Sequence, residues 1–161
     1  MRRIAETLSL AVLAEILLVA AFALYGPHRL PALIPTHFKA AGQPDGWGSP
    51  RALLLFPVIA SILYLLMTWV ARYPASFNFP VRVTPRNRKQ LEAIALSMIA
   101  WLKAEVLCIL AWVERSGIQV ARHPQQPFSA LPMPLLIGVV FATVFGHIAA
   151  VFRAARTPAR L

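Results

Sequence analysis

Four long apolar segments alternate with polar, turn-rich stretches along the chain. The apolar segments cover residues 8–25, 53–70, 91–113 and 133–152. A hydrocarbon core of about 30 Å requires about 20 helical residues, and backbone groups in lipid must be hydrogen-bonded within their own helix. The pattern therefore predicts an all-α membrane protein, a bundle of four transmembrane helices that forms a single domain over residues 1–161.

The first apolar segment also has a competing interpretation. Residues 21–23 (Ala-Phe-Ala) are similar to the small-residue site at which a signal peptide is cleaved. Glu15 lies in the middle of this segment, however, and the cores of signal peptides rarely tolerate a carboxylate. The segment is also longer than a typical signal core, so the sequence favours a retained transmembrane helix.

The polar stretch of residues 26–50 is rich in turn signals. Residues 43–46 (Gln-Pro-Asp-Gly) predict a turn, because proline pre-sets the first corner and glycine tolerates a positive φ. Residues 34–38 predict a short extended segment that leads into it. Ser49-Pro50 predicts a helix start, and Thr84-Pro85 repeats that signal. We expect this loop to be ordered against the helix ends, because 25 residues cannot build a core of their own.

The composition supports a membrane location and argues against nucleic acid as a partner. Apolar residues make up 58% of the chain and the mean hydropathy is +0.64, above the apolar fraction of about 45–50% in soluble domains. The net charge is +10, although only 14% of the residues are charged. Because the basic residues flank apolar segments and belong to no nucleic-acid-binding motif, we expect membrane lipid to be their partner.

The basic residues also predict the orientation in the membrane. Ten lie on the side of the N-terminus: Arg2, Arg3, Arg72, Arg82, Arg86, Arg88, Lys89, Arg153, Arg156 and Arg160. Five lie on the other side: Arg29, Lys39, Arg51, Arg115 and Arg122. Short loops rich in Lys and Arg remain in the cytoplasm. The sequence thus predicts a multi-pass protein of the inner (cytoplasmic) membrane, with both termini cytoplasmic and the loop 26–50 extracytoplasmic.

Four charged or histidine side chains fall deep inside the apolar segments, whereas Glu92 lies near the end of its segment, where it can reach the lipid headgroups. The four are Glu15, Lys103, Glu105 and His147. Such groups are costly in a bilayer and usually face the bundle interior. Glu15 and Lys103 lie at similar predicted depths, so we expect them to form an ion pair. We expect His147 to form an interhelical hydrogen bond, in a region where Gly146 permits close helix packing.

Sequence motifs for catalysis or metal binding are weak. The candidates His28, His37 and Asp45 match no standard zinc spacing, so no metal is expected. We expect His37 to bond its own turn, with Asp45 as the candidate partner. Cys108 lies in an apolar segment and is interpreted as a packing residue. There is no nucleotide-binding glycine motif or serine elbow, so no catalytic residue is assigned and no cofactor is expected.

The loop residues resemble the signature of a known family. Residues 34–38 read Ile-Pro-Thr-His-Phe and residues 42–47 read Gly-Gln-Pro-Asp-Gly-Trp. This pair of motifs resembles the domain-of-unknown-function 1648 family of bacterial integral membrane proteins, a domain that SdpI-type toxin-immunity proteins also carry. A weaker resemblance continues at residues 77–81 and 101–103. The resemblance implies a functional surface in the loop, formed by Pro35, Thr36, His37, Phe38, Gly42, Pro44, Asp45, Gly46 and Trp47.

Three functions remain open from the sequence. The first is a binding, sensor or immunity-like module that uses the loop to recognise an extracytoplasmic peptide or protein. The second is an accessory subunit of a larger membrane complex. The third is a small transporter or membrane enzyme that uses Glu15, Lys103 and Glu105. The sequence favours a role without catalysis but leaves an enzyme open.

Overall fold

A computed structural model describes residues 1–39, 41–126, 128–129 and 131–156 of the chain. The basic residue Arg160 lies outside these described ranges. Within them, the structure holds four helices long and apolar enough to cross a membrane: α1 (Arg2–Tyr25), α2 (Leu55–Val70), α3 (Arg88–Arg122) and α4 (Met133–Arg156). The predicted all-α, multi-pass membrane fold is therefore confirmed.

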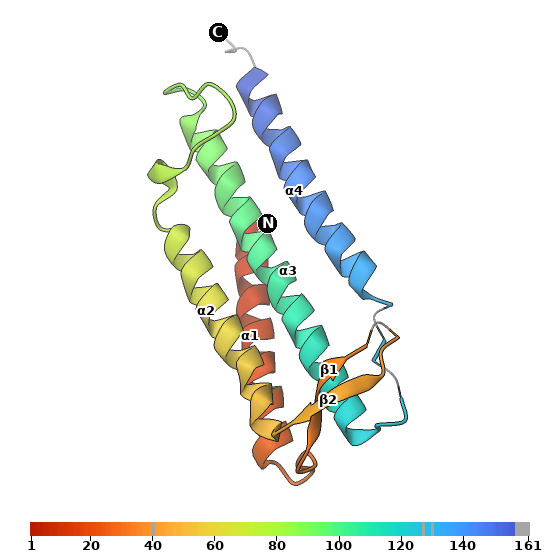
Figure 1. The fold of residues 1–161 in the computed structure, drawn as a ribbon. Helices are drawn as coiled ribbons and strands as arrows, with labels where there is room; N and C mark the ends of the chain where they lie inside the picture. Colours follow the sequence, from red (N-terminus) through yellow and green to blue (C-terminus); the bar gives the residue numbers. More distant parts are fainter. Residues whose placement is uncertain (40, 127, 130, 157–161) are drawn as a thin grey trace.

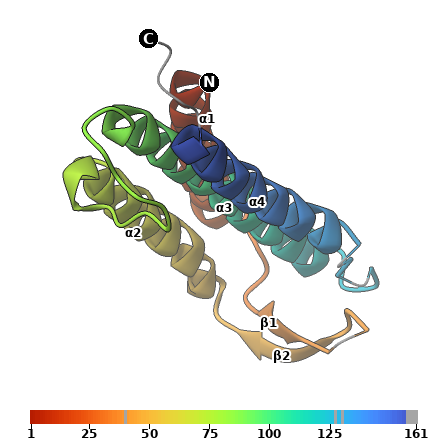
Figure 2. The same cartoon turned by 90° about the horizontal axis from the view of Figure 1, so that it is seen from above.

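Helix α3 is the central element of the bundle. It packs against α1, α2 and α4, and α2 and α4 lie on different sides of it (Figures 1 and 2). The contact with α1 is the most extensive. The end of α3 that follows residue 113 and the connection to α4 also lie beside the small β-hairpin between α1 and α2.

Helices α1, α3 and α4 are longer than the apolar segments that predicted them, whereas α2 begins two residues later than its segment. Helix α3 continues through Glu114, which the sequence had assigned to a loop, as far as Arg122. Ile118 and Val120 are buried while Arg115 is exposed, so this last part is an amphipathic helix that hydropathy alone does not reveal. The helix ends just before Pro124, because proline disfavours helical geometry in the residue before it.

The two predicted helix starts have different outcomes. Ser49 caps the short 3-10 helix η1 (Pro50–Leu54) that leads into α2, and its Oγ accepts a hydrogen bond from Arg51 N–H. Thr84 instead forms a turn with Asn87, in which each side chain accepts a bond from the other residue's backbone N–H. Helix α3 begins only after this turn. A second 3-10 helix, η2 (Pro74–Ser76), lies in the connection from α2 to α3.

The loop between α1 and α2 folds into an antiparallel hairpin of β1 (Ile34–Phe38) and β2 (Pro44–Gly48). The extended segment at residues 34–38 was predicted, but the turn was misplaced. It lies at Lys39–Gln43, where the Gly42 N–H bonds the Lys39 carbonyl and Gly42 takes φ +78°. Pro44 therefore begins a strand, a position that proline tolerates.

Small residues form much of the helix contact surface. Ala5, Ala20, Ala60, Ala100 and Ala104 are at most 2% exposed, and small side chains let transmembrane helices approach closely. Gly146 does not share this role, because a Cβ added there would meet nothing within 4 Å. The expectation for Gly146 was therefore wrong.

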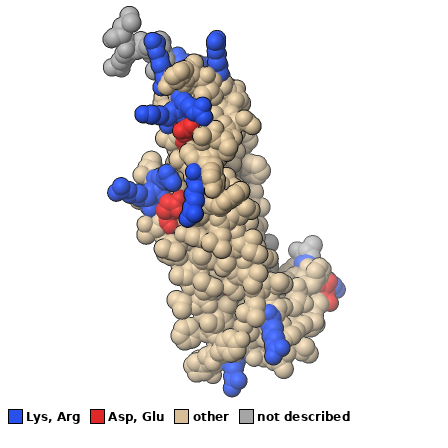
Figure 3. Space-filling view, turned by 90° about the vertical axis from the view of Figure 1, so that its left-hand side faces the viewer, with Lys and Arg blue, Asp and Glu red and all other residues tan. Residues whose placement is uncertain are grey.

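Charged residues lie mainly at one end of the molecule. On the face seen in Figure 3, Lys and Arg gather at the end where α3 begins and α4 ends, with fewer near the hairpin. The surface between them is uncharged on this face. Large apolar side chains such as Phe22 and Leu65 are 66% and 65% exposed, as expected for helices that face lipid.

Candidate functional site

The β-hairpin brings the predicted loop residues together on one small structure. His37 in β1 lies opposite Gly46 in β2, so its ring reaches the neighbouring Asp45. His37 Nδ1 lies 2.5 Å from Asp45 Oδ1, and the two side chains are 73% and 30% exposed. The expected bond between His37 and its own loop is therefore confirmed.

The chemistry of this pair fixes which ring atom is available. A carboxylate only accepts hydrogen bonds, so Nδ1 of His37 is the protonated ring nitrogen and donates a hydrogen bond to Asp45. The partner of Nδ1 sets the orientation of the ring, and Nε2 is left for a ligand. Gly46 permits this arrangement, because a Cβ there would lie 2.9 Å from His37 Cβ.

The hairpin is anchored by Phe128 in the connection between α3 and α4. The Phe128 ring lies 5.0 Å from that of Phe38 and 5.3 Å from that of Trp112, centre to centre. Phe128 N–H also donates to the Gly42 carbonyl at 2.8 Å. Sequence reasoning missed Phe128; its only signal was a lone aromatic residue within a polar stretch.

Each strand of the hairpin contains residues that are shielded and residues that are exposed. Ile34 and Pro35 are buried, whereas Thr36 and Trp47 are exposed. A groove of about 360 Å³ runs between β2 and the start of the α3–α4 connection, where Trp47 and Pro124 form part of its lining. The exposed residues of the hairpin thus include Trp47, which borders the groove, and the His37–Asp45 pair.

His28 does not join this group as a metal ligand. The Arg122 side chain donates to its carbonyl at 3.1 Å, which ties the segment before the hairpin to the end of α3. Across the residues that the structure describes, no three His, Cys, Asp or Glu side chains are placed to hold a metal ion.

The polar groups between the helices pair differently from the prediction. Lys103 Nζ donates to Glu6 Oε2 at 2.6 Å and to Thr68 Oγ1 at 2.9 Å, and it lies 4.5 Å from the centre of the Tyr64 ring. Glu15 pairs instead with Arg115, at 2.5 Å. The predicted Glu15–Lys103 pair was therefore wrong.

The physical reason for this error is the stagger of the helices. Glu6 was not considered because it precedes the apolar segment, yet helix α1 already begins at Arg2. The first turns of α3 extend past the start of α1 (Figure 1). Lys103, in the middle of α3, therefore lies beside the first turns of α1. Arg115 was placed in a loop, whereas it belongs to α3 and lies level with Glu15.

Three further polar groups lie along α3. Thr143 Oγ1 donates to Glu105 Oε1 at 2.5 Å. His147 bridges α4 to α3, with Nδ1 against the Thr143 carbonyl and Nε2 against Ser97 Oγ, so the expected interhelical bond is confirmed. Glu114 is fully buried, and neither of its carboxyl oxygens has a hydrogen-bond partner among the described residues.

Comparison with known proteins places the hairpin inside a recognised domain. Residues 14–60 match the family described as "Domain of unknown function (DUF1648)". The matched residues cover the second half of α1, the whole hairpin and the start of α2. An uncharacterized protein of Archaeoglobus fulgidus is 40% identical over 60 residues, which cover 32% of this chain. The match spans about a third (33%) of that relative's length, and no solved structure matches the chain.

Some of the polar residues described above lie within the DUF1648 match, and others lie outside it. The match contains Glu15, the whole hairpin and the start of α2 up to Ala60. Lys103, Glu105 and Glu114 of α3, together with His147 of α4, lie outside it. The hairpin is therefore a polar, exposed part of the residues that match DUF1648, and it is the candidate functional site.

Proposed function

We propose that this chain is a membrane-embedded binding module that recognises an extracytoplasmic peptide or protein through the hairpin. The single observation that supports this most strongly is the exposed His37–Asp45 pair. The pair lies on a two-stranded sheet that Phe128 holds against the end of α3. A binding surface whose side chains are ordered before the ligand arrives loses less entropy on association.

The proposed location follows from the distribution of charge. Lys and Arg are enriched at the end of the bundle opposite the hairpin, and short basic segments remain cytoplasmic. We place this end in the cytoplasm and the chain in the inner membrane. The hairpin then faces the outside, where it can meet a secreted peptide or the outer part of another membrane protein.

The exposed side of the hairpin suits an extended peptide. Trp47 is 51% exposed and borders the groove beside β2, and exposed aromatic residues are typical binding anchors. His37 Nε2 would supply a directed polar contact beside this anchor. An immunity-like role is one form of this proposal, in which the peptide is a toxin; membership of a larger complex is another.

Photo-crosslinking in whole cells tests the proposal. A photoreactive residue at Thr36, which is exposed and directly precedes His37 in β1, should trap a specific product. One at Ile62, which is exposed on α2, should not. His37→Ala and Asp45→Ala should each lower this product about tenfold, as the loss of a hydrogen bond to a charged group implies.

Lys39→Ala provides the matched control, because Lys39 is exposed on the same hairpin and lies outside the proposed surface. The Lys39→Ala variant should give as much crosslinked product as the chain without this substitution. Equal yields in all three variants would show that the His37–Asp45 pair is not the binding site.

A small ion or proton transporter is the second candidate, and the buried Glu114 favours it. A carboxyl group without partners in a low-dielectric core is costly to retain, and ionisable groups in membrane helices often mark ion pathways. In proteoliposomes, a transporter would show proton or cation flux that Glu114→Gln abolishes. Glu92→Gln, which removes an ion pair near the start of α3, should leave that flux unchanged.

A further inference from the structure

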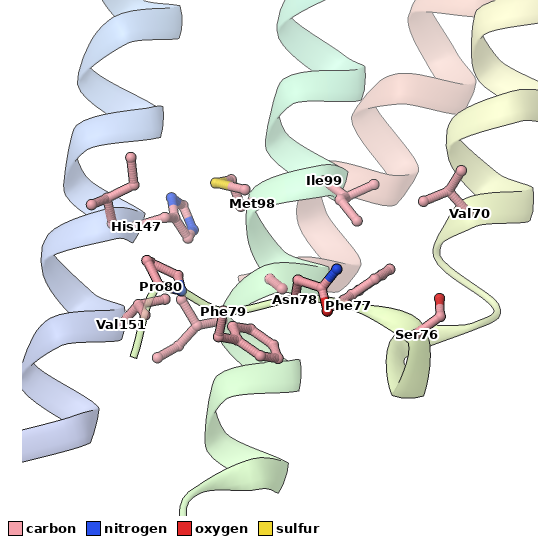
Figure 4. Close-up of a pocket in the computed structure, with 13 residues that line it drawn as sticks. Val70, Ser76, Phe77, Asn78, Phe79, Pro80, Met98, Ile99, His147 and Val151 are labelled. Carbon is pink, nitrogen blue, oxygen red and sulfur yellow. The ribbon is translucent and has the colours of Figure 1, made fainter. Parts of the chain in front are cut away.

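A second cavity lies at the other end of the bundle from the hairpin. Its volume is about 430 Å³, within the range of about 300–1,000 Å³ that is usual for ligand pockets. It lies over α3, with Val70 of α2 and His147 of α4 at its two sides (Figure 4). The segment of residues 76–80 crosses α3 from the α2 side to the α4 side and closes one end of the cavity.

The inner lining of this cavity is suited to hydrocarbon. Phe77, Phe79, Met98 and Ile99 are among its lining residues. His147 adds no free polar atom, because its two ring nitrogens already face the Thr143 carbonyl and Ser97 Oγ. A ligand that enters this space therefore finds mainly apolar surface and no unpaired ring nitrogen, although Ser76 and Asn78 also belong to the lining. This surface favours a flexible apolar chain.

The rim of the cavity has the opposite character. The connection from α2 to α3 carries Arg72, Arg82 and Arg86, and α3 begins with Arg88 and Lys89. The sequence has no acidic residue between Arg72 and Lys89. Arg72 follows the lining residue Val70 by two positions, and Arg82 follows the lining residue Pro80 by two; both arginines are exposed. An anionic headgroup at the rim would therefore meet a positive local field.

One arginine holds the crossing segment in place. The Arg88 side chain donates to the Ala75 carbonyl at 3.0 Å and to Glu92 at 2.9 Å. Phe79 and Val81 pack against the buried residues Leu91 and Val151. The cavity therefore has a fixed floor, in contrast to the open lipid-facing surfaces of α2 and α4.

We propose that this cavity binds one acyl chain of an anionic phospholipid, whose headgroup lies against the arginines of the α2–α3 connection. The bound lipid belongs to the leaflet at the basic end of the bundle. The proposal is independent of the function assigned to the hairpin. It rests on the combination of a largely apolar cavity with basic residues next to it in the chain.

Lipid retention measured by native mass spectrometry tests the proposal. The protein is first incorporated into nanodiscs of equal parts phosphatidylglycerol and phosphatidylcholine, and is then transferred to detergent. We expect one phosphatidylglycerol to remain bound per chain. Ala95→Trp fills the cavity from α3 and should lower this retention about tenfold or more, because it removes burial for several methylene groups. Arg72→Gln with Arg82→Gln should remove the preference for the anionic lipid.

Ala142→Trp is the matched control. Ala142 is an exposed residue of α4 that does not line the cavity, so this variant should retain the lipid. Thermal unfolding of each variant establishes that it is folded. Equal retention by the two tryptophan variants, or equal retention of the two lipids by the unmodified chain, would overturn the proposal. A dimer that only Ala95→Trp dissociates would also overturn it, since a second copy of the chain would then occupy the cavity.

Discussion

Lys103 shows how a single charge is accommodated between the helices of this bundle. Its side chain is 1% exposed, yet three groups surround the ammonium: the Glu6 carboxylate, the Thr68 hydroxyl and the Tyr64 ring. Glu6, in contrast, is 34% exposed. The two members of the pair are therefore unequal, because only Glu6 retains access to water or lipid headgroups.

This inequality predicts an asymmetric response to substitution. Glu6→Ala leaves a buried, unpaired ammonium and should lower the free energy of unfolding by up to about 3–5 kcal/mol. Lys103→Met should cost less, because the remaining carboxylate is partly exposed. The double substitution should cost less than the sum of the two, with a coupling of about 0.5–3 kcal/mol. Thermal unfolding of the four proteins in detergent measures each term.

Glu15 supplies the control for that cycle. Glu15 pairs with Arg115 and not with Lys103, so the effects of Glu15→Gln and Lys103→Met should be additive. Coupling between Glu15 and Lys103, together with additivity between Glu6 and Lys103, would contradict the pairing described above.

For single residues, the sequence indicated some of the polar side chains that lie between the helices but not their partners. Polar residues within apolar segments are recognisable from hydropathy, and His147 bridges two helices as expected. Partner choice depends on the relative height of two helices about 100 residues apart in the chain, and no local pattern contains that information. Glu114 was missed because its neighbour Arg115 makes the local sequence resemble a loop.

The turn of the hairpin contains Gly42, which lies against Phe128 in the connection between α3 and α4. Gly42 takes φ +78°, and an added Cβ would lie 2.2 Å from the Phe128 carbonyl oxygen. Gly42→Ala should therefore strain the turn and also separate the hairpin from Phe128. We expect a loss of stability of more than about 1 kcal/mol and faster proteolysis of the loop, measured by thermal unfolding and limited digestion.

Gly138→Ala is the matched control for this element. Gly138 lies in α4, and a Cβ there would meet nothing within 4 Å. Alanine favours a helix over glycine by about 1 kcal/mol, so this variant should be as stable as the unmodified chain or more so. Similar melting temperatures for the two variants would show that the turn at Gly42 tolerates a side chain.

The sequence predicted the elements around this turn better than the turn itself. Ser49 was recognised as a cap and residues 34–38 as extended, because both signals are local. Pro44 to Gly46 have the composition of a turn, but they pair with β1. The deciding contact is the bond from Phe128 to Gly42, which joins residues far apart in the chain.

For the whole molecule, the proposed orientation gives a direct prediction. A reporter enzyme that is active only in the cytoplasm should be active when fused after Leu161. The same reporter inserted at Lys39, in the turn of the hairpin, should be inactive. The reverse pattern would place the hairpin in the cytoplasm and overturn the proposed binding of an outside partner.

Hydropathy was sufficient to predict four membrane helices, because the exposed faces of all four are apolar. Hydropathy did not predict where α3 ends, because the last turns of this helix are amphipathic and have no continuous run of apolar residues. The cavity over α3 was also beyond prediction, because it depends on how the segment of residues 76–80 crosses that helix.

The length of α3 has a mechanical consequence. Its 35 residues span about 52 Å at about 1.5 Å per residue, well beyond a hydrocarbon core of about 30 Å. The helix contains no proline, a frequent cause of sharp kinks, and it runs without a break in Figure 1, so we expect it to tilt as one stiff lever. A bilayer that becomes thinner or thicker changes the tilt of such a lever. We then expect the hairpin at one end and the α2–α3 connection at the other to move together.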